Sequence, residues 1–261
     1  MMLNNSKNRE ILRLAIPSII SNVTVPLLGL VDLSIVGHIG NEDYISAIAV
    51  GSMIFNVMYW LLGFLRMGTS GMTSQAFGRE DTVECIRILV RSLTIGLAFG
   101  LLFILTQSGL EWGLLRLMNT PEASWEYVTI YFQIVIWGAP AMLGLYSLTG
   151  WFIGMQDTRT PMVVAILQNL VNILASLSLV FVLGWGIAGV AAGTLLAQWI
   201  GFLVALLGAW KRIHKVNGLQ NKQGLATETW FRLVRVLSVK AAWINFFLVN
   251  KDIFLRTLCL I

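Results

Sequence analysis

The chain contains long stretches without a single charged residue, and these stretches constrain its fold more than any other feature. No Asp, Glu, Lys or Arg occurs within residues 14–31, 44–65, 92–110, 127–156 or 160–210. A helix needs about 20 mostly apolar residues to cross the hydrocarbon core of a bilayer, so each stretch is long enough for one span or two. Apolar residues make up 57% and charged residues 12% of the 261 residues, and a soluble domain carries roughly twice that charge. We therefore predict an all-α fold, a polytopic bundle of transmembrane helices, and exclude a soluble enzyme, a disordered chain and a disulfide-stapled domain.

Seven spans are predicted from the apolar stretches and the residues that flank them. They cover residues 12–37, 44–76, 88–108, 125–151, 160–183, 187–210 and 241–260. Pro17 and Pro26 interrupt the first span and Pro140 interrupts the fourth. Such prolines free backbone carbonyls that neighbouring helices must satisfy, which indicates a packed bundle. In the sixth span Gly189 and Gly193 have a spacing typical of close helix packing.

Three parts of the chain are expected from this pattern. Residues 1–210 form a six-span N-terminal transmembrane lobe, residues 211–240 a cytoplasmic basic amphipathic connector, and residues 241–261 an incomplete seventh span. The connector is typical of a helix that lies on an anionic leaflet, with a regulatory or partner site as the alternative. Because the sequence stops inside the seventh span, we expect an incomplete product.

Lysine and arginine residues gather at one set of span ends, which indicates how the chain is oriented. The residues at these ends are Lys7, Arg9, Arg13, Arg79, Arg87, Arg91, Arg159, Lys211, Arg212, Lys215, Lys222, Arg232, Arg235 and Lys240. The opposite ends carry Arg116. Since basic loops stay in the cytoplasm, we predict a multi-pass protein of the cell membrane, the inner membrane of a bacterium, with a cytoplasmic N-terminus.

Enzymes, metal proteins and nucleic-acid binders find little support in the sequence. The two histidines, His38 and His214, are not paired with acids at the spacing of metal ligands, and Cys85 lies far from Cys259. No nucleophile or phosphate-binding motif occurs. The basic segments lack the interleaved aromatic residues that bind single strands. We expect no catalytic residues, no cofactor and no nucleic-acid partner, and the lipid bilayer as the chain's surroundings.

Asp32 is the acidic residue placed well inside the first span, and it is the leading candidate for a functional residue. A charged group inside a membrane is costly and usually functional. Burial favours the neutral form of a carboxyl group, so such a group can bind and release a proton near neutral pH. If ionised and supported by neighbouring oxygens, it can instead hold Na⁺. The alternative is a carboxylate near the outer interface that reaches water.

Polar side chains also follow one face of three further spans. They are Asn169, Asn172 and Ser176 in the fifth span, Thr194 and Gln198 in the sixth, and Asn56 and Tyr59 in the second. Such stripes either join helices by hydrogen bonds or line a binding cavity, and their spacing alone does not separate the two roles.

Four segments together carry a resemblance to a known family. They read LRLAIPSIISNVTVPLLGLVDLSIVGHIG (12–40), RMGTSGMTSQAFGRE (66–80), GWFIGMQDTRTPMVVAILQNLVNILAS (150–176) and GWGIAGVAAGTLLAQ (184–198). In this order and spacing the chain resembles the multidrug and toxic compound extrusion (MATE) transporters, most closely their bacterial DinF-like branch. The resemblance implies twelve spans in two six-helix lobes with a substrate cavity between them. It also implies export of cationic or amphipathic organic compounds by antiport with H⁺ or Na⁺.

The resemblance also implies roles for particular residues. Asp32, Asn172 and Thr194 match the ion-coupling site of the DinF-like branch, and Pro26 matches a proline where the first helix bends. Relatives carry a second acid where this chain has Ser176, which changes the expected Na⁺ affinity. Asn169, Gln198, Asn56 and Tyr59 remain candidates for lining the cavity.

Three functions follow as hypotheses. The first is a cation-coupled antiporter that exports small organic compounds, with H⁺ or Na⁺ and a second half of the transporter as partners. The second is a membrane fragment that does not transport, and the third is a flippase of lipid-linked sugars from the same superfamily. An intramembrane enzyme ranks last.

Overall fold

The computed structural model describes residues 30–37, 42–118 and 120–221, together with residues 12, 15–17, 19–20, 23 and 250–251. Within these residues the chain forms helices and no strand. The named helices are α2 (Glu42–Leu61), α3 (Phe64–Gly78), α4 (Thr82–Leu105), α5 (Gln107–Leu117), α6 (Glu122–Val135), α7 (Ala139–Gly154), α8 (Arg159–Leu177) and α9 (Gly186–Asn221). A 3₁₀ turn, η1 (Ile136–Gly138), joins α6 to α7, and a π-helical turn, η2 (Ser178–Val182), ends α8.

Five of the predicted spans are confirmed by helices that are long and apolar enough to cross a bilayer. These helical segments are Glu42–Gly78, Thr82–Leu105, Ser124–Gly154, Arg159–Val182 and Gly186–His214. The all-α membrane-spanning class predicted from the sequence is therefore confirmed. Residues 13–14, 18, 21–22 and 24–29 of the first predicted span lie outside the described residues, as does most of the seventh span.

Two of these segments are interrupted, each at a residue that weakens helical hydrogen bonding. Pro140 follows η1 and has no backbone N–H to donate, so the turn tightens before α7 begins. This is the interruption of the fourth span that the sequence predicts. Between α2 and α3 the backbone N–H of Gly63 donates to the carbonyl of Trp60 at 2.9 Å, the shorter bond of a tightened turn.

The structure differs from the sequence-based expectation at two helix ends. A separate helix, α5, follows α4 after a break at Thr106, where we expected the end of a span and a loop. In addition, α9 runs without interruption to Asn221. The boundary predicted at residue 210, between the sixth span and the connector, therefore falls inside a helix. Residues 222–249 lie outside the described part of the chain.

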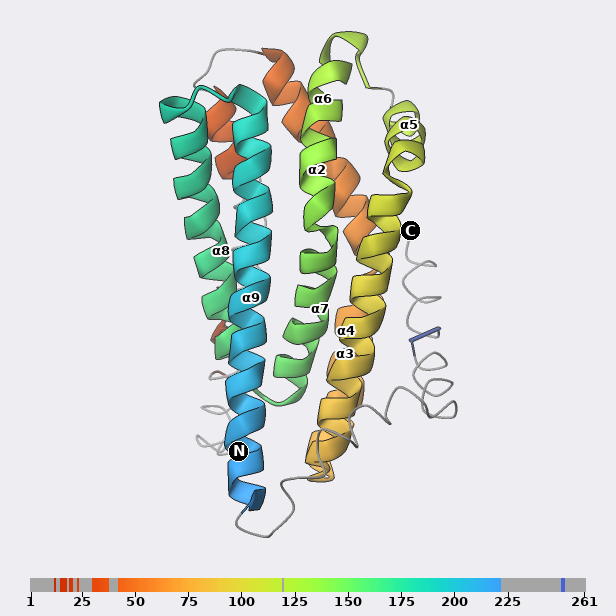
Figure 1. Cartoon of the computed structure of the whole chain (residues 1–261), viewed down its shortest axis with the longest axis vertical. Coiled ribbons are helices and arrows are strands. Elements are labelled where there is room, and N and C mark those ends of the chain that lie inside the picture. Colours follow the sequence, from red (N-terminus) through yellow and green to blue (C-terminus); the bar gives the residue numbers. More distant parts are fainter. Residues whose placement is uncertain are drawn as a thin grey trace, which may run out of the picture.

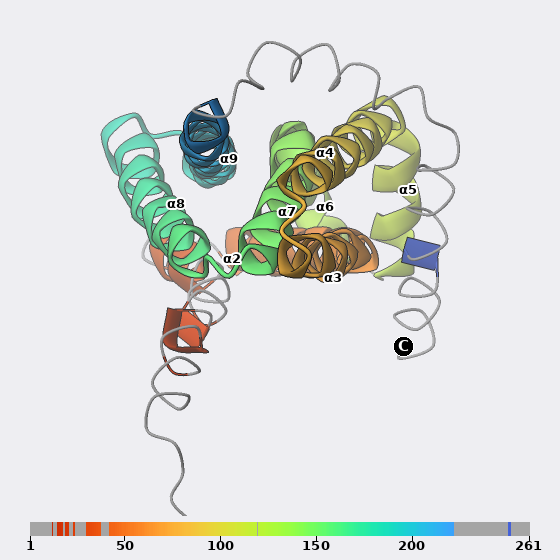
Figure 2. The same ribbon diagram turned by 90° about the horizontal axis from the view of Figure 1, so that it is seen from below.

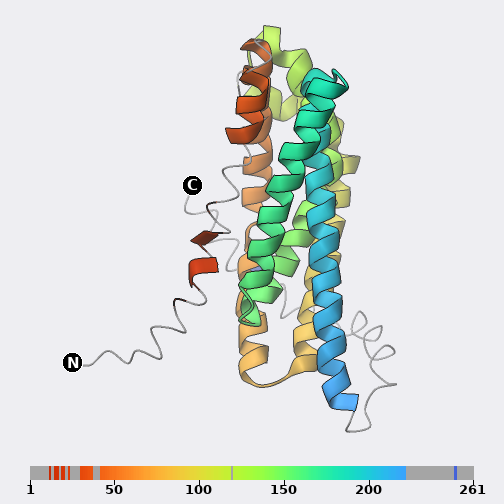
Figure 3. The ribbon, with the colours of Figure 1, turned by 90° about the vertical axis from the view of Figure 1, so that its left-hand side faces the viewer.

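Helix α7 is at the centre of the bundle and packs against α3, α4 and α9 (Figure 2). Glycines permit these close contacts: a Cβ at Gly150 would meet the backbone oxygen of Arg66 and the Cβ of Thr69 on α3. Helices α8 and α9 lie side by side along their length (Figures 1 and 3). They are joined by a tight turn in which Gly184 and Gly186 adopt positive φ angles of 70° and 54°, which glycine accepts at little cost.

The two ends of the bundle carry opposite charge. At the upper end in Figure 1, where α2, α6 and α9 begin, the described acidic residues include Glu42, Asp43, Glu111 and Glu126. The basic residue described at this acidic end is Arg116. At the opposite, basic end the described basic residues outnumber the acidic ones. The basic residues there include Arg79, Arg87, Arg91, Arg159, Lys211 and Arg212, and the acidic residues are Glu80, Asp81, Glu84 and Asp157. The charge asymmetry read from the sequence is thus an asymmetry between the two ends of one bundle.

A polar clasp at the basic end ties the loop between α7 and α8 to α9. The Arg212 guanidinium donates from Nη1 to Asp157 Oδ2 at 2.6 Å and from Nη2 to the carbonyl of Met155 at 3.2 Å. The Asp157 carboxylate also accepts from the backbone N–H and the hydroxyl of Thr160 in the first turn of α8. One carboxylate thereby holds three chain segments together.

Candidate functional site

Asp32 lies in the helical stretch 30–37 and is buried, with 2% of its surface exposed. Its neighbours Ile35 and Val36 belong to the largest hydrophobic cluster of the bundle, which also contains Phe55 and Phe132. The carboxyl group is therefore inside the packed helices. The alternative placement that the sequence left open, at an interface in contact with water, is not the one observed.

Side chains from two further helices join Asp32 in a buried chain of contacts. The Thr194 hydroxyl of α9 lies 3.1 Å from Asp32 Oδ2, to which it donates a hydrogen bond. The Asn172 amide of α8 donates from Nδ2 to the same hydroxyl oxygen at 3.0 Å. Asn172 is fully buried and Thr194 nearly so. The structure thus brings together three residues that are far apart in the sequence.

The Thr194 hydroxyl has two acceptors for its single hydrogen. The carbonyl oxygen of Val190, one turn earlier in α9, also lies 3.1 Å from Thr194 Oγ1. The hydroxyl can therefore donate to Asp32 or to its own helix, while it accepts from Asn172 in either case. This choice makes the Thr194 contact sensitive to the charge on Asp32.

Tyr131 of α6 is a fourth residue at this site, and the sequence reasoning missed it. Its side chain interacts with those of Asp32, Thr194 and Ser52. The ring packs over Gly51 of α2, where a Cβ would overlap it, and it makes an edge-on contact with Phe55 at a centroid distance of 6.3 Å. Tyr59 stands out in the sequence because it shares a polar stripe with Asn56, whereas Tyr131 is not assigned to such a stripe, so the sequence does not single it out.

Several oxygens around Asp32 have no hydrogen-bond partner among the described residues. They are Asp32 Oδ1, Asn172 Oδ1 and Ser176 Oγ, all buried. Ser176 lies one turn beyond Asn172 on α8 and packs directly against Gly193, the residue before Thr194. Buried polar atoms without partners are costly, and they are the atoms available to bind a proton or a cation.

Gln198, Tyr59 and Asn56 are not in this chain of contacts. Gln198 is buried one turn beyond Thr194, with its amide oxygen against Gly138 of η1. Tyr59 is buried and Asn56 is exposed on α2. Asn169 is partly buried on α8, one turn before Asn172. Pro26, the predicted hinge, lies outside the described residues.

The fold and this site together define a class: a multi-pass helical membrane protein with one carboxyl group buried among hydroxyl and amide groups. The MatE family model matches residues 17–178. The chain belongs to the MatE family, as its resemblance to the MATE transporters predicted.

Curated relatives show the same relationship over a longer stretch. The chain is 33% identical over 259 residues to the DNA damage-inducible protein F of Escherichia coli, a match covering 98% of this chain and 53% of that protein. It is 26% identical over 240 residues to a probable multidrug resistance protein NorM of Thermotoga maritima, a match covering 88% and 50% of the two chains. The chain thus spans about half the length of these relatives.

Solved structures share the fold. A transporter of the MOP superfamily from Pyrococcus furiosus is 25% identical, with a TM-score of 0.68 over 75% of this chain and 43% of that one. A MATE protein crystallised in its bent conformation is 24% identical, with a TM-score of 0.71 over 76% and 44% of the two chains.

Proposed function

We propose that this bundle is the ion-coupling half of an antiporter that exports cationic or amphipathic organic compounds. Asp32 binds the coupling ion, H⁺ or Na⁺. The observation that carries the proposal is the buried contact chain from Asp32 through Thr194 to Asn172. Because the chain spans about half of its curated relatives, we propose transport for the assembly that this bundle forms with a second lobe.

The chemistry of the site supports ion binding. An ionised carboxylate in a buried position is unfavourable unless a proton or a cation neutralises it. Asp32 Oδ1, Asn172 Oδ1 and Ser176 Oγ are oxygens without partners among the described residues, and hard cations prefer oxygen ligands. One carboxylate with neutral oxygens around it suits a single positive charge.

Ion binding at this position would change how helices contact one another. Asp32, Thr194 and Asn172 belong to the first span, α9 and α8. When Asp32 is neutralised, the Thr194 hydroxyl gains less by donating to it, and the carbonyl of Val190 competes for the same hydrogen. An ion that binds one arrangement of these helices more tightly shifts the population toward it, which is what coupling requires.

Transport in proteoliposomes that hold this bundle together with a second lobe tests the proposal. We expect export of ethidium, an organic cation, driven by an imposed H⁺ gradient or Na⁺ gradient, and we expect Asp32→Asn to abolish the dependence on the gradient. Glu126→Gln, an exposed acid at the end of the bundle, is the matched control and retains export. Gradients imposed one at a time identify the coupling ion. Gradient-driven export that persists in Asp32→Asn contradicts the proposal.

A further inference from the structure

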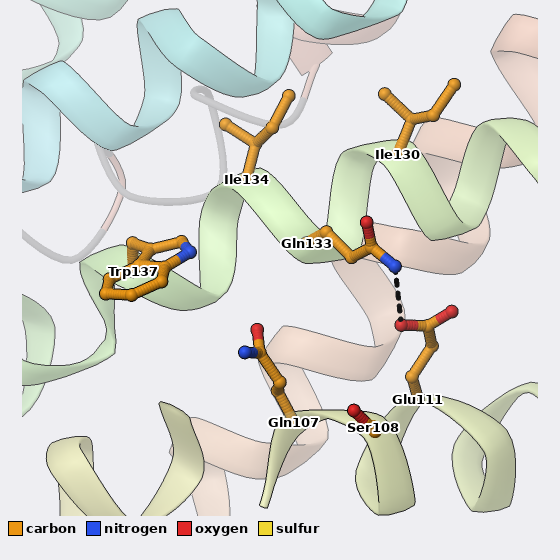
Figure 4. A pocket seen from close by; sticks show the side chains of 7 residues that line it. All are labelled: Gln107, Ser108, Glu111, Ile130, Gln133, Ile134 and Trp137. Atoms are coloured by element: carbon orange, nitrogen blue, oxygen red, sulfur yellow. Dashed lines mark hydrogen bonds between the residues drawn. The ribbon is translucent and has the colours of Figure 1, made fainter. Parts of the chain in front are cut away.

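A pocket of about 550 Å³ lies between α5 and α6, away from the buried Asp32 site. It is lined by Gln107, Ser108, Glu111, Ile130, Gln133, Ile134 and Trp137 (Figure 4). Gln133 follows Tyr131 by two residues, which places it on the opposite side of α6 from the ring that faces Asp32. The pocket is therefore separate from the site described above.

The break at Thr106 creates this pocket. The Thr106 hydroxyl donates to the carbonyl of Leu102 at 2.8 Å and ends α4, and α5 then continues beside α6. Across the gap, Gln133 Nε2 donates to Glu111 Oε2 at 3.2 Å (Figure 4). This bond bridges the pocket and fixes the Glu111 carboxylate within its wall.

The Glu111 carboxylate has no basic partner in the described part of the chain. No described lysine, arginine or histidine lies within ion-pair distance of it. Arg116, the basic residue at the same end, instead places its guanidinium over the ring of Trp112, 4.3 Å from the ring centroid. Glu111 therefore keeps a negative charge that no described side chain balances.

Trp137 supplies an aromatic surface on the other side of the same pocket. Its side chain is 52% exposed, while its backbone carbonyl accepts a hydrogen bond from the Trp199 indole at 3.2 Å. The backbone is thus fixed and the ring is accessible. A tryptophan ring attracts cations through its face, and an adjacent carboxylate adds to that attraction.

The negative charge near the pocket also favours the binding of a cation. Helix α5, which forms one wall of the pocket, lies toward the acidic end of the bundle (Figure 1), where Arg116 is the basic residue among several described acidic ones. A surface lined by one sign of charge concentrates ions of the opposite sign. The side-chain oxygens of Gln107 and Ser108 provide further acceptors for N–H donors of a ligand.

We propose that the pocket between α5 and α6 is a binding site for an aromatic organic cation, held between the Glu111 carboxylate and the Trp137 ring. The positive charge of the ligand pairs with Glu111, and its flat ring stacks on Trp137. This site is distinct from the ion-coupling site, and binding here is an equilibrium property that requires no gradient. Its failure would leave the proposal for Asp32 standing.

Equilibrium dialysis of N-methylquinolinium with the whole chain, purified in phosphatidylglycerol nanodiscs, tests the site. We expect saturable binding that weakens about tenfold or more in Glu111→Gln and about threefold or more in Trp137→Leu. Glu42→Gln and Trp185→Leu, which change an exposed acid and an exposed tryptophan outside the pocket, are matched controls and leave the affinity unchanged. Thermal melting of each variant verifies that it is folded.

Two further ligands distinguish a site for an aromatic cation from an apolar pocket and from a lipid site. Quinoline, which has the same ring system without the charge at pH 8, is expected to bind much more weakly. Binding of N-methylquinolinium is expected to persist when phosphatidylethanolamine is added to the nanodiscs. Loss of binding on that addition would mean that the ammonium group of a lipid occupies the pocket, and it would overturn the proposal. Equal affinities of wild type and Glu111→Gln would also overturn it.

Discussion

At the scale of single residues, the coupling proposal depends on one hydroxyl group. Thr194 Oγ1 touches Asp32 on one side and Asn172 on the other. The second carboxylate oxygen of Asp32 and the amide oxygen of Asn172 are both buried without a hydrogen-bond partner among the described residues. The hydroxyl is therefore the link through which a change of charge on Asp32 reaches α8 and α9.

Thr194→Val removes this hydroxyl while it preserves the shape of the side chain. A hydrogen bond to a charged group contributes about 1.5–3 kcal/mol. The Thr194 hydroxyl donates to the ionised form of Asp32, so its loss destabilises that form and we expect H⁺ to bind about tenfold or more tightly. Thr194→Ser restores a hydroxyl and should return the H⁺ affinity most of the way to the wild-type value. Ion-dependent transport measured against H⁺ or Na⁺ concentration gives the comparison. Equal ion dependence in Thr194→Val and wild type would show that the hydroxyl is not involved.

The position of Tyr131 depends on the absence of a side chain at Gly51. A Cβ at this residue would overlap the tyrosine ring, and an aromatic ring buried against Phe55 cannot move aside easily. We expect Gly51→Ala to destabilise the bundle by about 1–3 kcal/mol. Gly71→Ala on α3, where a Cβ meets nothing within 4 Å, is the control. Thermal melting in detergent should show a lower transition for the first variant than for the second.

At the scale of helices, α8 and α9 are joined to each other at both ends, by a contact distant in sequence at one end and by a tight turn at the other. At the basic end, the Asp157–Arg212 clasp ties the first turn of α8 to the C-terminal part of α9. Toward the other end of the same helices, the tight turn at Gly184 and Gly186 joins them again. Helices α8 and α9, which carry Asn172 and Thr194, are thereby constrained to move as a pair.

Arg212→Met breaks the clasp and keeps an unbranched side chain. An ion pair of this exposure contributes about 1 kcal/mol or less, so we expect up to about a fivefold faster amide hydrogen exchange in the first turn of α8. Lys211→Met changes the neighbouring exposed cation, for which no ion pair is found among the described residues, and serves as the control. Unchanged exchange in Arg212→Met would mean that the clasp does not stabilise this turn.

At the scale of the whole molecule, hydropathy and charge predict much of the architecture. A bilayer permits few spanning structures, so charge-free stretches identify the described spans well. Pro140 likewise predicts the interruption at η1, because a proline inside a helix lacks the backbone N–H that would donate to the preceding turn. Helix α5 escaped prediction because Glu111 and Arg116 interrupt its apolar residues. The extension of α9 escaped because its charged residues end the apolar stretch without ending the helix.

The sequence predicts which residues belong to the candidate site, but it does not predict which of them contact one another. An acid and two polar residues inside apolar spans are visible in the sequence. That Thr194 contacts Asp32 is not, since 162 positions separate them and packing decides which faces meet. Tyr131 and the pocket around Glu111 depend wholly on how α6 is rotated between its neighbours.

The charge asymmetry of the bundle predicts its orientation in the membrane, with the basic end in the cytoplasm. We replace Cys85 and Cys259 by alanine and introduce Trp112→Cys at the acidic end or Lys211→Cys at the basic end. Both positions are exposed. A membrane-impermeant maleimide should label the first variant in intact bacteria and the second after permeabilisation alone. The reverse pattern would contradict the orientation.

The central claim is that the Asp32 carboxyl group itself binds the coupling ion, and infrared difference spectroscopy of the whole chain in nanodiscs tests it most directly. We predict that the C=O stretching band of a protonated buried carboxyl group disappears as the pH rises or as Na⁺ or an organic cation is added. The band should be absent in Asp32→Asn and unchanged in Glu126→Gln. A band that persists in Asp32→Asn, or a wild-type band that responds to none of these ligands, would contradict the claim.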